Sequence, residues 1–119
     1  MKTFEEWLEG YLAFQREAAS FLSRPLPTEL AQLHTEQQEL EPLRWKAEGF
    51  AAAGAGRYYK AKAIIMEKYW SEVAKTALND VAKAQCHKEL WAREDSHGIL
   101  DSVRGRIFAV NSQLKRIEP

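Results

Sequence analysis

The stretch ILDSVRGRIFAVNSQLKRIEP, residues 99–119, decides the fold of this chain. Its aliphatic side chains recur at alternating spacings of three and four residues, which is the a/d repeat of a heptad on one face of a helix. The repeat consists of Leu100, Val103, Ile107, Val110, Leu114 and Ile117. So narrow a stripe has to bury against another helix, from the same chain or from a second copy. We therefore predict a C-terminal heptad helix that joins copies of the chain into a homo-oligomer.

The composition favours an all-α protein. The chain has 119 residues with only 4 prolines and 6 glycines, and 45% of its residues are apolar. These values suit a single helical domain over residues 1–119, built as a small bundle of four to five helices. Its one cysteine, Cys86, excludes an internal disulfide. Since the N-terminus is acidic and no run approaches about 18 apolar residues, we expect a soluble cytoplasmic protein without a membrane span, in the host cytoplasm if a phage encodes it.

The first helix is predicted from Phe4 to about Ser23, because Thr3 and Glu6 have the spacing of a capping box. After a proline-rich break, Thr28 is the expected N-cap of the second helix. Pro42 either opens a new helix or kinks a longer one.

Two further helices are predicted over residues 57–75 and 77–97, and the heptad helix follows them. Gly98 is expected to break or kink the chain before the heptad helix begins. The run of alanine and glycine at residues 51–56 is not a phosphate-binding loop, because it lacks the spacing of that motif and no strand precedes it.

The sequence holds no assembled catalytic or metal-binding motif. Cys86 and His87 are adjacent, so on a helix they point about 100° apart and cannot act together. Glu94 and His97 form one Glu-x-x-His pair, but a carboxylate-bridged metal site needs a second copy of it and two further glutamates. We therefore expect no metal, no cofactor and no enzymatic activity.

Charge is distributed unevenly along the chain. Residues 1–56 hold 5 Lys/Arg and 9 Asp/Glu, and residues 57–119 hold 12 and 8. The basic half can bind a polyanion, the two halves can pair in an oligomer, or both can be ordinary solvated helix faces.

Cations and aromatic rings alternate at the start of the basic half, in Arg57-Tyr58-Tyr59-Lys60-Ala61-Lys62. Cations neutralise phosphates and rings stack on unpaired bases, so this pattern indicates single-stranded nucleic acid. Tyrosines at helical spacing also fill cores, and lysines usually lie in solvent. The predicted contact residues are Arg57, Tyr58, Tyr59, Lys60 and Lys62, with Arg104 and Arg106 on the last helix.

Residues 100–110, Leu-Asp-Ser-Val-Arg-Gly-Arg-Ile-Phe-Ala-Val, resemble the C-terminal helix of the UvsY-type phage recombination mediators. The order of a helical half with tryptophans, a basic-aromatic stretch, a linking helix and a terminal helix is similar too. The resemblance implies an oligomer that binds single-stranded DNA, displaces or remodels the single-strand-binding protein and loads a RecA-like recombinase. In that family the cations precede a Tyr-Tyr pair, whereas Lys60 and Lys62 follow Tyr58 and Tyr59 here.

The alternative is a helical protein-interaction module of phage type, for example an inhibitor of a host or defence protein. Such a module would have no DNA affinity and an exposed aromatic patch around Trp7, Tyr11, Trp45 or Trp70.

Overall fold

Four helices make up the fold, in a computed structural model that describes residues 2–118. They are α1 (Phe4–Leu22), α2 (Leu30–Tyr69), α3 (Lys75–Gln85) and α4 (His87–Ile117). The described residues contain no strand, so the prediction of an all-α bundle is confirmed. No helix among residues 2–118 combines the length and apolarity that a membrane crossing requires.

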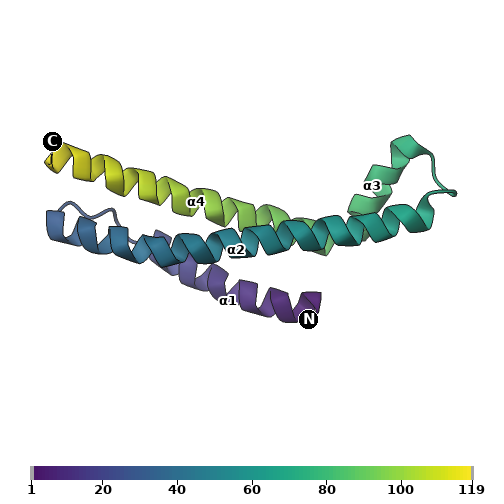
Figure 1. Ribbon diagram of the computed structural model, residues 1–119, viewed down its shortest axis with the longest axis horizontal. Helices are drawn as coiled ribbons and strands as arrows, with labels where there is room; N and C mark the ends of the chain where they lie inside the picture. The colour runs from purple at the N-terminus through teal and green to yellow at the C-terminus, as the bar shows by residue number, and fades with distance from the viewer. Residues whose placement is uncertain (1, 119) are drawn as a thin grey trace.

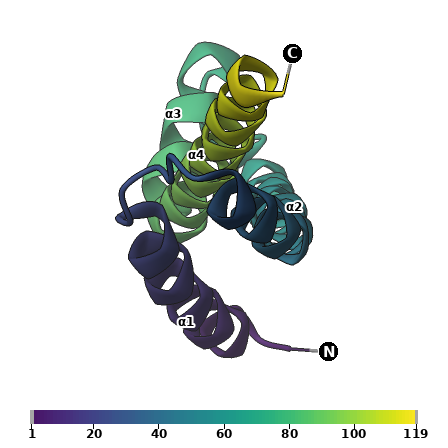
Figure 2. The same ribbon diagram turned by 90° about the vertical axis from the view of Figure 1, so that its left-hand side faces the viewer.

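The two long helices, α2 and α4, run antiparallel side by side along the molecule, which measures 62 × 28 × 19 Å (Figure 1). Figure 2 shows that α1 lies across one side of this pair. α3 folds back against the far end of α2, next to the start of α4 (Figure 1). The molecule is therefore a short three-helix body with a protruding arm.

Each of the three helices in the body carries its own apolar seam. In α1 the buried residues repeat every three or four positions, and the register is Trp7, Tyr11, Phe14, Ala18 and Phe21. A matching series runs along α2: Leu33, Glu36, Leu40, Leu43, Ala47, Ala51, Gly54 and Tyr58. These seams meet that of α4 in one core cluster, so the rings of α1 act as core and not as a surface for bases.

The predicted C-terminal helix is longer than its heptad pattern indicated. α4 begins at His87 and runs through Gly98 without a break, so the expected break before Ile99 is wrong. Gly98 lies on the exposed face with open space around its α-carbon. Its helix penalty of about 1 kcal/mol is offset because the flanking Ser96 and Leu100 both pack in the core.

Similarly, α2 is one helix of 40 residues that contains Pro42. The separate helix predicted over residues 57–75 is therefore the second half of α2. Proline removes one backbone hydrogen bond, at a cost of about 3 kcal/mol. Leu40 and Leu43 are buried on either side of it and hold the helix together.

The predicted helix ends agree in part with the structure. The Thr3 hydroxyl accepts from the Glu6 amide at 3.2 Å and donates to the Glu6 carboxylate at 3.2 Å, so Thr3 caps α1 as predicted. Glu29, and not Thr28, precedes the first residue of α2, and it makes no capping hydrogen bond through its side chain. The helix predicted over residues 77–97 is divided at Cys86, where α3 ends and α4 begins.

Candidate nucleic-acid interface

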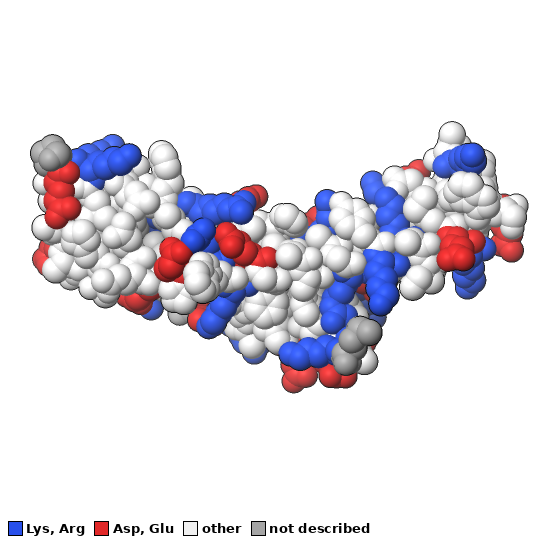
Figure 3. Space-filling model, viewed as in Figure 1, with Lys and Arg blue, Asp and Glu red and all other residues white. Residues whose placement is uncertain are grey.

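The protruding part of the molecule, residues 57–93, is referred to below as the distal arm. It consists of the second half of α2, the turn at residues 70–74, α3 and the first two turns of α4. It holds eight Lys/Arg and four Asp/Glu, whereas the rest of the chain holds nine and thirteen. In Figure 3, basic side chains gather to the right of centre, where the arm begins, while basic and acidic groups alternate on the left. The arm is therefore the basic part of the molecule.

None of the arm's eight cations forms an ion pair with another described residue. All six ion pairs among residues 2–118 involve other parts of the chain. Arg24 pairs with Glu39, and Lys46 with Glu17. The arm's positive charge is thus not neutralised internally, and a polyanion meets no competing carboxylate on these side chains.

The two tyrosines predicted to stack on bases differ in position. Tyr58 is 2% exposed and packs in the core, and burial raises the pKa of its hydroxyl. Tyr59 is 53% exposed on the surface of the arm. Only Tyr59 therefore offers a ring to a base.

The three predicted cations of this stretch also differ. Arg57 is half-buried, donates to the Lys2 carbonyl oxygen at 3.1 Å and lies 5.6 Å from the centre of the Trp7 ring. Lys60 is exposed, and Lys62 lies 5.8 Å from the Tyr58 ring. Arg57 therefore holds the N-terminus against α2, while Lys60 and Lys62 are the better placed for phosphates.

Arg93, a residue that the sequence analysis did not identify, joins this site from α4. Its guanidinium carbon lies 5.1 Å from the Tyr59 ring centre and 5.5 Å from that of Tyr58. Its Nε is buried without a hydrogen-bond partner. Extending the α4 repeat backwards from Leu100 through Ser96 and Ala92 would have placed Arg93 beside the seam, but the expected break at Gly98 hid that register.

The two arginines predicted on the last helix do not join the site. Arg104 is exposed, but it lies eleven residues along α4 from Arg93, or about 16 Å. Arg106 forms a nearly buried bidentate pair with Glu36, with both N···O distances at 2.7 Å. It also donates to the carbonyl oxygens of Arg24 at 2.8 Å and Pro25 at 3.1 Å. A phosphate could reach Arg106 only by displacing Glu36, so this residue is better described as a clasp on the α1–α2 loop.

The predicted oligomerisation seam packs inside the chain. Leu100, Val103, Val110 and Leu114 are buried within a single copy, and Ile107 is partly buried. Ile117, near the C-terminus, is 39% exposed. The first four could join two copies only if α2 of one chain replaced α2 of the other. Oligomerisation through these residues stays a prediction.

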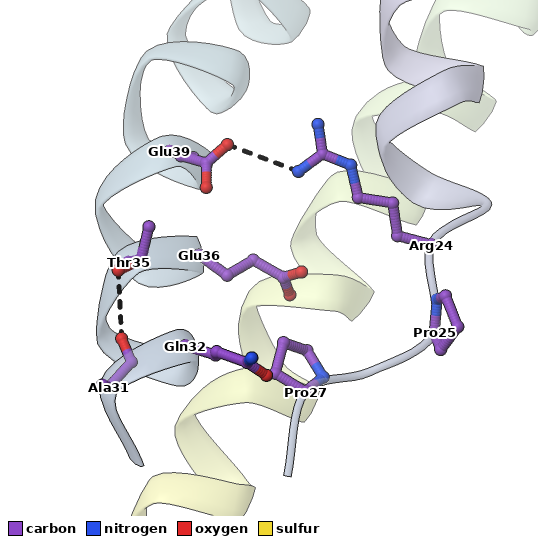
Figure 4. Close-up of a pocket in the computed structure, with 8 residues that line it drawn as sticks. All are labelled: Arg24, Pro25, Pro27, Ala31, Gln32, Thr35, Glu36 and Glu39. Atoms are coloured by element: carbon purple, nitrogen blue, oxygen red, sulfur yellow. Dashed lines mark hydrogen bonds and ion pairs between the residues drawn. The ribbon is translucent and has the colours of Figure 1, made fainter. Parts of the chain in front are cut away.

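A hollow of about 320 Å³ lies under the α1–α2 loop (Figure 4). Arg24 reaches across it towards Glu39 at 3.4 Å, and Glu36 points into the space between them. Because Glu39 pairs with Arg24 and Glu36 with Arg106, neither carboxylate is available to a ligand. This hollow is a consequence of how the loop packs.

The residues considered for chemistry remain separate. Cys86 is buried at the α3–α4 junction, and burial raises the pKa of its thiol. His87 is exposed, and its Nδ1 lies 3.3 Å from the Ala84 carbonyl oxygen. Among residues 2–118, no three His, Cys, Asp or Glu side chains are grouped so that they could hold a metal ion.

Comparisons of the chain with protein-family models, with curated proteins and with solved structures found no match.

Proposed function

We propose that this protein binds single-stranded DNA through the distal arm and acts, without catalysis of its own, as a recombination mediator that helps to load a RecA-like recombinase. The observation that carries the proposal is the set of eight arm cations without carboxylate partners, arranged around the exposed ring of Tyr59. The role in recombination comes from the resemblance of residues 100–110 to the UvsY-type mediators, and with it the single-strand-binding protein as a further partner.

Electrostatics supports a weak site in each copy. A protein that neutralises phosphates releases counterions, so its affinity falls steeply with salt. One arm offers few phosphate contacts, and a homo-oligomer would bind one strand with several arms at once. That arrangement raises the overall affinity without any new contact.

Fluorescence anisotropy with a labelled single-stranded oligonucleotide, titrated at low and at high salt, tests the proposal. We expect binding at low salt that weakens as salt is added. Lys60→Ala combined with Lys62→Ala should weaken binding and lower the slope of log affinity against log salt by about 2, since each lost phosphate contact changes it by about 1.

Lys115→Ala combined with Arg116→Ala is the matched control, because it removes two exposed cations at the opposite end of α4. It should leave the affinity and the salt slope unchanged. No binding by the parent chain at low salt would contradict the proposal, and equal losses in both double variants would show an effect of net charge alone.

A helical protein-interaction module is the second candidate, favoured by an apolar hollow of about 450 Å³ between α1 and the start of α4. Phe4, Leu8 and Trp91 line it, with Glu5, His87 and Lys88 around them. Trp7 and Tyr11, named above as part of an exposed patch, are buried in the core, whereas Trp45 and Trp70 are exposed. A folded chain without DNA affinity would favour this function.

A further inference from the structure

Two exposed aromatic side chains lie on the same face of α2 in the distal arm. Tyr59 is 53% exposed, and Trp70, which caps the helix in a helical conformation, is 59% exposed. They are eleven residues apart, so three turns of helix place them within about 20° of each other around the axis and about 16 Å apart along it. The face between them is referred to below as the aromatic track.

Each ring of the aromatic track has a cation against it. The Arg93 guanidinium lies 5.1 Å from the Tyr59 ring centre, and the Lys75 ammonium lies 5.3 Å from the Trp70 ring. These cations come from α4 and from the start of α3, so three helices contribute to the track. Neither cation has a carboxylate partner among the described residues.

Lys62 lies between the two rings on α2, three residues after Tyr59. Its ammonium is 5.8 Å from the buried Tyr58 ring, which leaves its hydrogens facing outwards. Rings flanked by unpaired cations match a polymer that offers flat apolar surfaces and negative charges in alternation.

We propose that one strand of DNA lies along the aromatic track, with a base stacked on Tyr59, another on Trp70, and the intervening phosphates held by Arg93, Lys62 and Lys75. This inference rests on the proposed function and specifies its binding site. At 3.4 Å per phosphate of a stacked strand, the track accommodates about five nucleotides. Base-to-ring stacking tolerates any sequence, as a mediator requires.

The arrangement of the other exposed apolar residues favours a single strand over a membrane or a protein surface. Ile64 is 59% exposed, but it follows Tyr59 by five residues and lies about 140° away around α2. The apolar side chains of the arm therefore do not merge into one patch. A duplex keeps its bases stacked on each other, so it would meet the cations but not the rings.

Two probes of equal length and charge separate stacking from charge: a labelled oligothymidylate and a labelled oligomer of abasic nucleotides. We expect Tyr59→Ala and Trp70→Ala each to weaken binding of oligothymidylate by about fivefold to 150-fold. Binding of the abasic oligomer, and the salt slope for both probes, should not change.

Trp45→Ala is the matched control, because Trp45 lies on the same helix, is 67% exposed and is outside the arm. It should bind both probes as the parent does. Trp70→Phe keeps a ring and should retain most of the affinity that Trp70→Ala loses, which separates stacking from a local change of fold.

If both alanine variants bind oligothymidylate as the parent does, the aromatic track is not the site, although the proposed function survives. Equal losses on both probes would also overturn the inference, because they would show no role for the bases. If the parent binds neither probe, the proposed function itself fails.

Discussion

At the scale of single residues, the role of a cation in this protein depends on what stands opposite it. Arg106 and Lys60 were both predicted to contact DNA from their neighbours in sequence. Arg106 faces Glu36 across the α2–α4 interface, and its side chain is 12% exposed. Lys60 has no carboxylate within ion-pair distance and stays exposed. The partner of Arg106 is seventy residues away, which is why local sequence could not distinguish the two.

The clasp formed by Arg106 predicts a large effect on stability. Arg106→Ala leaves the Glu36 carboxylate buried without its counter-charge and frees the carbonyl oxygens of Arg24 and Pro25. We expect the free energy of unfolding to fall by about 3 kcal/mol, measured by urea denaturation. Lys46→Ala is the comparison, because the pair of Lys46 with Glu17 is about half exposed on both sides. It should cost less than about 1 kcal/mol, and similar losses in both variants would mean that the clasp does not matter.

At the scale of elements, the sequence predicts which faces are buried better than it predicts where helices end. The heptad on residues 100–114 is indeed a buried stripe, and the aromatic face of α1 is core. The breaks expected at Gly98 and between the two halves of α2 are absent. Glycine and proline carry local penalties of about 1 and 3 kcal/mol, and contacts with residues far away in sequence outweigh them. Those contacts cannot be read from a local window.

Gly54 marks the closest approach between α2 and α4, and it predicts a second effect on stability. A β-carbon there would lie 3.0 Å from the Ser96 hydroxyl oxygen and 3.4 Å from the Trp7 ring, whereas one at Gly56 would meet nothing within 4 Å. We expect Gly54→Val to lower the free energy of unfolding by about 1 to 3 kcal/mol. The same substitution at Gly56 should change it by less than about 0.5 kcal/mol. Equal behaviour of the two variants in urea denaturation would refute the close packing.

At the scale of the whole molecule, charge and shape divide the chain in the same place. The body, outside residues 57–93, has four more acidic than basic residues, and the distal arm has four more basic than acidic ones. The basic half was recognisable in the sequence, but its boundary near Arg93 was not. That boundary exists because α4 passes from the arm into the body, where its seam meets those of α1 and α2. A strand bound to the arm would therefore be kept away from the acidic body.

The same view of the molecule decides what the heptad seam of α4 does. Val110 is fully buried against the other helices of its own chain, so Val110→Asp places an unpaired charge in the core of one copy. We expect this variant to lose its cooperative unfolding transition and much of its helical circular dichroism. Phe108→Asp, two residues away on the same helix at a side chain that is 74% exposed, should keep both. If Val110→Asp instead remains fully helical and light scattering shows a lower mass than the parent's, the seam joins copies of the chain. In that case α2 must be exchanged between them.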